Sequence, residues 1–238
     1  MSEKLVAVVT GAARGLGKQI AVTLGKSGYH VVVNYTRSKS EAEELVLSMD
    51  GKALAVMADV GNSSEVQKMA ENVFQKWGRV DLLINNAGIA RDGLLLKYTE
   101  NNWNEVMRVN LKGVYNSVKS FAPLMIQSGG GHIVNIASSS GLRGKAGQAA
   151  YSASKAALIG LTTTLARELG GFHVKVNAVL PGYMATEMGG GAEDAMSKAR
   201  EESIINCLSD PDEVAGFIQY LVTTHTITGQ VFCLDSRI

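Results

Sequence analysis

The sequence predicts an α/β protein in which helices cover both faces of one doubly wound parallel sheet. Three observations support this prediction. Short apolar runs rich in β-branched residues alternate with longer segments of helical periodicity. Several of these runs are apolar almost throughout, as strands buried on both faces are. A glycine-rich turn joins the first run to the first helical segment, which is where doubly wound folds bind phosphate.

Seven runs are predicted as strands because each is short and dominated by valine, isoleucine, leucine or alanine. In chain order they are KLVAVV (4–9), HVVVNY (30–35), ALAVMA (53–58), VDLLINN (80–86), GHIVNIA (131–137), HVKVNAV (173–179) and GQVFCLD (229–235). Helical periodicity is found between them, at 14–27, 40–49, 63–77, 100–126, 151–169, 193–204 and 211–223. A helix between successive strands carries the chain back to the same end of the sheet, so the strands are predicted to be parallel. The glycines at 189–191, after the sixth strand, indicate a mobile segment.

Length and composition indicate one soluble domain. A chain of 238 residues with 46% hydrophobic residues can bury a large core, and residues 1–238 are expected to form a single catalytic domain. The 23 basic and 22 acidic residues nearly balance, and no block of like charge indicates a nucleic-acid or membrane surface. Cys207 and Cys233 are too few for a disulfide framework, and no His lies at metal-ligand spacing from them. With no membrane span or cleavable leader recognised, we expect a cytoplasmic protein that binds small molecules and no metal.

The turn after the first strand predicts a dinucleotide site of the Rossmann type. Gly11, Gly15 and Gly17 separate the first strand from the first helix in the stretch VVTGAARGLGKQIA. Small residues let the backbone turn tightly there and bring the helix N-terminus up to a phosphate. The spacing differs from the commoner Gly-x-Gly-x-x-Gly, and a strand-to-helix turn without a ligand is the alternative interpretation.

The end of the second strand favours NADPH over NADH. An NAD site places a carboxylate about 20 residues beyond the glycines to hold the ribose 2′-hydroxyl, whereas arginine suits a 2′-phosphate. Here the chain reads NYTR at 34–37, with no carboxylate, and Arg37 is joined by Arg14 in the glycine turn. The alternative is that both arginines are ordinary solvated surface charges.

Tyr151 and Lys155 lie four residues apart on a predicted helix and therefore share one face of it. A phenol with a pKa near 10 is a poor acid or base at neutral pH, but a nearby ammonium favours the phenolate and lowers the pKa. Tyr151 could then give or take a proton. Small neighbours such as Ala153 and Ala157 leave room for a cofactor and a substrate. Chance spacing on an ordinary helix is the competing interpretation.

Further motifs occur together with this pair. They are TGAARGLG at 10–17, NNAG at 85–88, Asn110 in VNLKGVY, Ser138 in IVNIASSSG and PGYMATEM at 181–188. In this order and spacing the chain resembles the short-chain dehydrogenases/reductases over nearly its whole length. Within that family, NAGIARDGLLLK and GQAAYSASKAALIGLT look most like the 3-oxoacyl-[acyl-carrier-protein] reductases of fatty acid synthesis.

The resemblance implies a role for each catalytic candidate. The residue matching Tyr151 protonates the substrate oxygen, and the one matching Ser138 hydrogen-bonds that oxygen. The residue matching Lys155 holds the nicotinamide ribose and lowers the pKa of the phenol. Asn110 would support a water chain that resupplies the proton. For Ser138 and Asn110 the alternative is an ordinary polar residue that leaves a strand or is satisfied inside a helix.

The resemblance also implies a set of cofactor contacts. Asp59 and Val60 would meet the adenine, Asn86, Ala87 and Gly88 would pass the adenosine ribose, and Thr186 with the backbone near Met184 would meet the nicotinamide carboxamide. The complete expected set is Gly11, Arg14, Gly15, Leu16, Gly17, Thr36, Arg37, Asp59, Val60, Asn86, Ala87, Gly88, Tyr151, Lys155, Pro181, Gly182, Met184 and Thr186. Ser138, Gln148 and Tyr151 are expected to contact the substrate, and Arg91 is expected at the cleft or at a subunit interface.

The chain departs from the family pattern near its C-terminus. A Gly-Arg-containing stretch before the helix that begins near Pro211 is replaced by INCLSDPDEVA, and a glycine pair after the last strand is replaced by CLDSRI. Basic residues for an acidic carrier protein are few, with His132, His173 and Lys175 in the two stretches where arginine is usual. These departures put the substrate lid and the subunit contacts in doubt.

The expected activity is NADPH-dependent reduction of a 3-oxoacyl thioester, carried by acyl carrier protein. An enzyme that reduces acetoacetyl-CoA or another small ketone is the alternative within the family. A non-catalytic nucleotide sensor is the alternative of another class, which the set Asn110, Ser138, Tyr151 and Lys155 argues against, since a sensor needs no proton donor. The helices at 100–126 and 151–169 carry more apolar residues than a sheet-facing stripe requires, and they resemble the pair through which the family forms homotetramers.

Overall fold

The computed structural model describes residues 4–185 and 193–237, and within them seven strands form one sheet. The strands are β1 Val6–Val9, β2 His30–Tyr35, β3 Ala53–Met57, β4 Leu82–Asn85, β5 Gly131–Ile136, β6 Val174–Pro181 and β7 Val231–Leu234. Six of the seven predicted runs contain one of them, and the run 173–179 overlaps β6, which continues to Pro181. Neighbours are parallel throughout, in the order β3-β2-β1-β4-β5-β6-β7. The predicted doubly wound fold is confirmed.

The strand order reverses between β1 and β4, where Val8 pairs with Val32 on one side and with Leu83 on the other. The chain after β1 turns toward β2, and the chain after β4 turns toward β5. Their connections leave in opposite directions and open a space at the carboxyl ends of the strands. A ligand of this fold is therefore expected at that edge.

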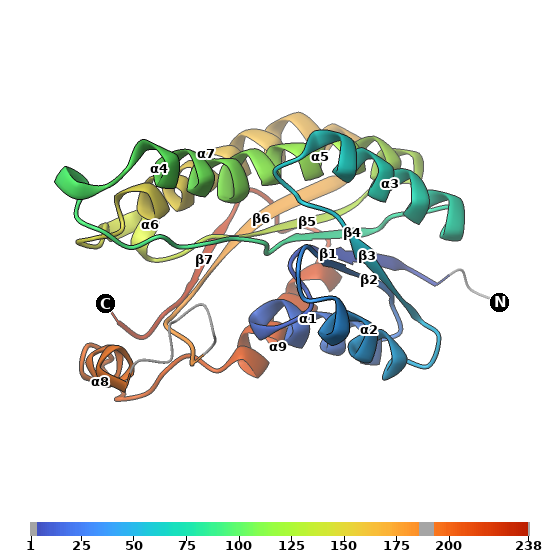
Figure 1. The fold of residues 1–238 in the computed structure, drawn as a ribbon. Coiled ribbons are helices and arrows are strands. Elements are labelled where there is room, and N and C mark those ends of the chain that lie inside the picture. The colour runs from blue at the N-terminus through green and yellow to red at the C-terminus, as the bar shows by residue number, and fades with distance from the viewer. Residues whose placement is uncertain (1–3, 186–192, 238) are drawn as a thin grey trace.

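Helices cover both faces of the sheet (Figure 1). They are α1 Gly15–Lys26, α2 Lys39–Leu47, α3 Ser63–Trp77, α4 Glu100–Met107, α5 Gly113–Gln127, α6 Ser140–Arg143, α7 Ala149–Leu169, α8 Glu193–Glu201 and α9 Pro211–Thr223. In the view of Figure 1, α3, α4, α5 and α7 lie above the sheet, whereas α1, α2 and α9 lie below it. The short α8 lies apart from both layers, near the C-terminus.

Alternate residues of each central strand pack into the two hydrophobic cores on opposite faces of the sheet. Val6 and Val8 of β1 pack under α3, α5 and α7, whereas Ala7 and Val9 pack against α1, α2 and α9. All four are fully buried. Each large apolar side chain removed from water contributes about 1.5–3 kcal/mol, so continuous apolar strands are stable only between two helical layers.

Local signals explain several helix ends. The Asn62 side chain accepts hydrogen bonds from the amides of Ser64 and Glu65 and so caps α3, which ends at Gly78 in the left-handed region at φ 71°. The Asp210 side chain accepts from the amide of Asp212 at the start of α9. Such caps satisfy backbone donors that have no partner inside the helix.

Three elements differ from the expectation. The segment predicted as one helix at 100–126 contains a π-helical turn, η2 Arg108–Lys112, between α4 and α5. Hydrophobic periodicity does not reveal one inserted residue in a turn. The helix α6 was not predicted, because four residues are too short for a periodic pattern. The helix expected at 193–204 ends at Glu201, and the glycines at 189–191 lie outside the described residues.

Candidate active site

Ser138, Tyr151 and Lys155 meet at the carboxyl end of β5. Ser138 follows that strand by two residues, and the pair Tyr151 and Lys155 lies in the first two turns of α7. The side chains of Ser138 and Tyr151 share a hydrogen bond. The Nζ of Lys155 donates to the carbonyl of Ile136 at 2.7 Å and lies 5.6 Å from the centre of the Tyr151 ring. The structure therefore brings together three of the four expected catalytic side chains.

The phenol of Tyr151 is neutral at physiological pH. Burial raises its pKa above the ordinary value of 10, the hydrogen bond to Ser138 lowers it, and the charge of Asp92 raises it further. The pKa therefore lies above the ordinary value, because burial is the largest effect and the Lys155 ammonium donates to Ile136 rather than to the phenol. The lowering by Lys155 that the resemblance implies stays a prediction. At neutral pH the Tyr151 hydroxyl thus carries a proton that it could donate.

Lys155 is a buried cation of reduced basicity. Lys155 is only 4% exposed, and burial lowers the pKa of its ammonium from 10.5 to about 8. Desolvation disfavours the ammonium, which retains one protein acceptor in the described residues. The charge remains at neutral pH and is available to stabilise a phenolate.

Asn110 lies inside the π-helical turn and connects two segments. Its side-chain oxygen accepts from the Ile89 amide at 2.8 Å, and its side-chain nitrogen donates to the Ile89 carbonyl at 2.9 Å and to Ser154 Oγ at 3.1 Å. Ser154 Oγ in turn donates to the carbonyl of Tyr151 at 2.7 Å. Asn110 is fully buried. It therefore fixes the loop after β4 against the catalytic helix, and a π turn at such a position is typical of functional sites.

Gly88 keeps a space open in front of this group. A Cβ placed on Gly88 would lie 3.4 Å from Asn110 Oδ1 and 3.6 Å from Lys155 Nζ. The missing side chain leaves those two polar atoms facing a position that a cofactor can reach. This is the observation that best fits a ribose hydroxyl beside Lys155.

The glycine turn is fixed by neighbouring amides. Gly11 and Gly15 have φ of 62° and 55°, a region that side chains rarely adopt. A Cβ on Gly17 would lie 2.4 Å from the Gly11 carbonyl and 2.5 Å from Asn86 Nδ2. Asn86 donates to the carbonyls of Thr10 and Gly11, and Thr10 Oγ1 accepts from the amides of Asn86 and Ala87. The turn and the segment after β4 form one rigid unit.

Asn34 connects the same turn to β2. Its side-chain oxygen accepts from the Gly11 amide at 3.2 Å, and its amide group donates to the carbonyl of Ala58 at 2.9 Å. Asn34 thus points into the protein, and the position offers no carboxylate. Arg14 and Arg37, with Thr36, are exposed at the ends of these two connected segments. The arrangement fits a 2′-phosphate between the arginines.

The adenine candidate Asp59 is held by a residue that sequence reasoning missed. Arg108 donates to Asp59 Oδ2 at 2.8 Å and to both oxygens of Glu105 at 2.8 and 3.0 Å. Asp59 Oδ1 accepts from the Gly61 amide at 2.8 Å. Val60 is buried, and its carbonyl accepts from Asn116. No sequence signal marked Arg108, whose role follows from the packing of η2 against the segment after β3.

The remaining candidates are distributed along the same edge. The hydrogen bond from Arg108 is the main cause of the lowered pKa of Glu105, and the charges of Arg91 and Arg37 act in the same direction. The expected place of Arg91 at the cleft or at a subunit interface stays a prediction. Gln148 donates to Asp92 at 3.2 Å and accepts from Ser140 Oγ at 3.3 Å. Its amide is therefore occupied at both ends.

The nicotinamide candidates follow β6. Pro181 ends the strand, Gly182 is buried, and Met184 packs against the core beneath α1 and α9. Leu16 is buried in the same core. Thr186 lies outside the described residues. Its predicted contact stays a prediction.

Neither a membrane-spanning helix nor a metal-binding cluster occurs among the residues that the structure describes. Across residues 4–185 and 193–237, no helix has the length and hydrophobicity that crossing a membrane requires. In the same part of the chain, no group of three or more His, Cys, Asp or Glu side chains could hold a metal ion.

Comparisons with known proteins agree with this geometry. Residues 5–197 match the family model described as short chain dehydrogenase. The chain is 42% identical to a 3-oxoacyl-[acyl-carrier-protein] reductase of Synechocystis sp., over 97% of this chain and 95% of the relative. It is 40% identical to the reductase of that name, FabG, of Staphylococcus epidermidis and 39% identical to that of Staphylococcus aureus, with 94% of both chains covered in each case.

Proposed function

Because the chain belongs to the short-chain dehydrogenase family, we propose that it reduces the 3-keto group of a 3-oxoacyl thioester with NADPH, as its relatives' names indicate for them. The observation that carries this proposal is the group formed by Ser138, Tyr151 and Lys155 at the end of β5. A ketone reductase needs a proton donor and oriented hydrogen bonds at one point, and this group supplies both.

The residues present fit a nicotinamide dinucleotide. Gly88 leaves the space described above, Gly17 lets α1 pack closely against Gly11 and Asn86, and the N-terminus of α1 follows the glycine turn. Its unpaired amides and partial positive charge favour a phosphate there. Gly11, Arg14 and Gly15 would hold the phosphates, and Lys155 would hold the nicotinamide ribose. NADPH supplies the hydride that the substrate ketone accepts.

The protein's own residues would control the proton. Ser138 would hydrogen-bond the ketone oxygen and orient it toward Tyr151. Tyr151, neutral because of its burial, would donate its proton as the carbonyl carbon is reduced, leaving a phenolate. The ammonium of Lys155, 5.6 Å from the centre of the Tyr151 ring, would stabilise that phenolate in a site of low dielectric. Asn110 would hold the loop after β4 in register, and a water chain beside it would return a proton to Tyr151.

The substrate carrier and the assembly belong to the same proposal. We propose acyl carrier protein as the carrier and a cytoplasmic homotetramer of one catalytic domain, residues 1–238. An apolar groove of about 310 Å³ on the outer side of α5 and α7 supports association of those helices. Its lining residues are Tyr115, Val118, Lys119, Ala122, Pro123, Ile126, Leu161, Leu165, Glu168 and Leu169. Reduction of acetoacetyl-CoA as the natural substrate is the second candidate, favoured by the near-neutral charge of the chain.

The test is a substrate panel followed by NADPH absorbance. We expect turnover with acetoacetyl-carrier protein and acetoacetyl-CoA and little with sugars or cyclic ketones. Reduction of a cyclic ketone without turnover of either thioester would contradict the substrate assignment but not the reductase chemistry. No turnover with any ketone, together with tight NADPH binding, would favour a nucleotide sensor.

A further inference from the structure

Asp235 is a buried carboxylate beside the catalytic loop. It directly follows β7, the edge strand, and its side chain is only 2% exposed. Ser139 Oγ, in the residue next to Ser138, donates to Asp235 Oδ2 at 2.6 Å. On the other side, a Cβ on Gly182 would lie 3.0 Å from Asp235 Oδ1. Asp235 therefore contacts the two segments that leave β5 and β6, both of which carry site residues.

Arg237 neutralises this carboxylate. Its Nε donates to Asp235 Oδ1 at 2.9 Å and its Nη2 to Oδ2 at 2.7 Å, and its backbone amide also donates to Oδ1 at 3.1 Å. Burial alone would raise the pKa of Asp235, but the hydrogen bonds from Arg237 and Ser139 outweigh burial, and the pKa lies below its ordinary value. A bidentate arginine is the partner that makes a buried carboxylate tolerable.

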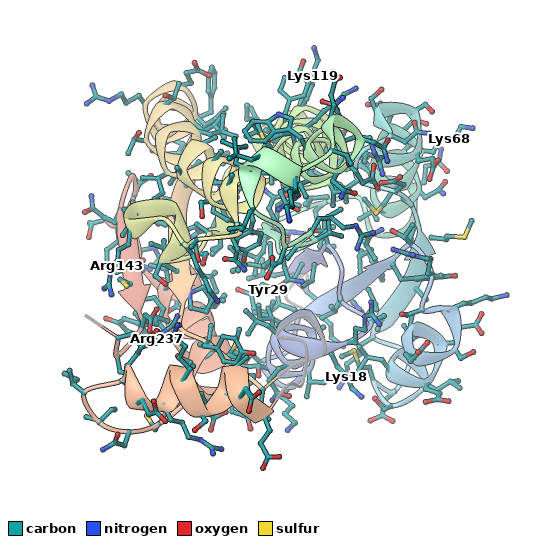
Figure 2. The ribbon with its side chains drawn as sticks, turned by 60° about the vertical axis from the view of Figure 1, so that its left-hand side comes forward. Lys18, Tyr29, Lys68, Lys119, Arg143 and Arg237 are labelled. Carbon is teal, nitrogen blue, oxygen red and sulfur yellow. The ribbon has the colours of Figure 1, made fainter. Side chains whose placement is uncertain are left out.

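Residues 235–237 also form hydrogen bonds to two other segments near the site. The Ser236 and Ser203 hydroxyls share a hydrogen bond of 2.7 Å, and the Ser236 carbonyl accepts from the Ile204 amide at 3.1 Å. The Arg143 guanidinium, at the end of α6, donates to the Arg237 carbonyl. Figure 2 shows Arg143 and Arg237 on the same side of the molecule, above α8. The segment 235–237 thus joins α6 to the chain that follows α8.

We propose that Asp235 is a positioning residue for the catalytic Ser138, acting through Ser139, and that Arg237 holds Asp235 in place. Ser138 Oγ also accepts from the Ser140 amide at 3.2 Å, so the three serines move as one loop. Asp235 holds the middle one. A displacement of this loop by a fraction of an ångström changes the alignment of Ser138 with Tyr151 and the ketone, to which proton transfer is sensitive.

The replacement of the expected glycine pair by Ser236 and Arg237 has a specific consequence here. Glycine has no side chain that could pair with Asp235 or with Ser203. In this chain the contacts of residues 235–237 with Ser203 and within the segment therefore depend on the side chains of Ser236 and Arg237, where the family pattern has glycine. The inference rests on the proposed function, because a positioned Ser138 matters only if a ketone is reduced.

The test compares two substitutions of the same kind. Asp235→Asn keeps the shape of the side chain and removes its charge. Asp81→Asn is the matched control, because Arg79 binds Asp81 through the same two nitrogens, with side chains 21% and 12% exposed, at the opposite end of the strands. With acetoacetyl-CoA and NADPH, we expect Asp235→Asn to lower kcat about tenfold and to leave the KM for NADPH within about twofold. Asp81→Asn should lower the melting temperature without changing kcat.

Ser139→Ala distinguishes an effect on the position of Ser138 from an effect on folding. It replaces Asp235→Asn in the test if that variant does not fold. It removes one hydroxyl, and we expect a kcat loss of at least threefold. In the double variant with Asp235→Asn, Ser139→Ala should lower kcat little further, because both substitutions act on the same Ser139–Asp235 contact. An unchanged kcat in Ser139→Ala, or an equal kcat loss in Asp81→Asn, would overturn the inference. Wild-type protein that reduces no thioester would contradict the proposed function itself, and with it the basis of this inference.

Discussion

Replacing Lys155 by methionine should stabilise the protein at neutral pH while weakening catalysis. In the folded protein burial lowers the pKa of Lys155 from 10.5 to about 8. At ~1.36 kcal/mol for each pH unit, this difference corresponds to about 3 kcal/mol of folding free energy lost to the burial of the charge. Methionine has nearly the same shape but no charge, and it also loses the hydrogen bond to the Ile136 carbonyl, at a cost of about 1–3 kcal/mol.

The sign of the pH dependence follows from the direction of the pKa change. Between pH 8 and 10.5 the unfolded lysine binds a proton that the folded lysine has lost, so wild-type stability rises with pH in this window. Below pH 8 both states are protonated, and the full penalty remains. The methionine variant lacks this titration. The stability difference between the two proteins should therefore move by about 3 kcal/mol in favour of wild type from pH 7 to pH 10.5.

Urea unfolding of both proteins at pH 7 and pH 10.5, at one protein concentration, measures this difference. The pKa changes of groups that do not interact with Lys155 cancel when the two proteins are compared at each pH. Lys155→Gln is a useful companion, since it keeps a donor for Ile136 without a charge. A stability difference that does not depend on pH, or one that moves toward the variant as pH rises, would refute the assignment of Lys155 as a buried cation.

Four further predictions concern activity and assembly. NADPH should be preferred over NADH by at least tenfold in kcat/KM, about 1.4 kcal/mol, because Arg14 and Arg37 are expected to bind the 2′-phosphate and residues 34–37 hold no carboxylate; equal use of both cofactors would contradict it. The kcat/KM for reduction should fall as pH rises through about 8, where Lys155 of the enzyme without ligand loses its charge. A kcat/KM that stays constant to pH 10 would exclude a role of this charge in catalysis. Light scattering should give the mass of a homotetramer, and a monomer at micromolar concentration would refute the use of the α5 and α7 groove. Carrier-linked acetoacetate should exceed acetoacetyl-CoA only modestly in kcat/KM, with weak salt dependence, since the net charge is +1; a large, salt-sensitive preference would show that a basic docking surface was missed.

The fold was predictable because its signals are local and repeated. Valine-rich runs such as 30–35 are strands in any context that buries both faces, and the glycine turn marks the point where the first strand meets its helix. The resemblance placed Ser138, Tyr151 and Lys155 in one site, and the structure brings these side chains together. Their exact contribution to catalysis stays a prediction.

What could not be predicted depends on tertiary packing. The direction of the Tyr151 pKa is set by burial, which spacing on a helix does not reveal. The π turn around Asn110 inserts a residue without changing the apolar pattern. Arg108 and Asp235 acquire partners 49 and 96 residues away in the chain, at Asp59 and Ser139. Pairings at such separations leave no trace in one sequence.

The central claim is that Tyr151 donates the proton to a ketone reduced with NADPH. Tyr151→Phe tests it most directly, because it removes only the hydroxyl, and Tyr220→Phe, on the exposed face of α9, is the matched control. With acetoacetyl-CoA, kcat should fall by roughly two to four orders of magnitude in Tyr151→Phe, while NADPH affinity measured by fluorescence stays nearly unchanged. Tyr220→Phe should match wild type. Turnover by Tyr151→Phe close to that of wild type would show that the proton comes from elsewhere and would contradict the account.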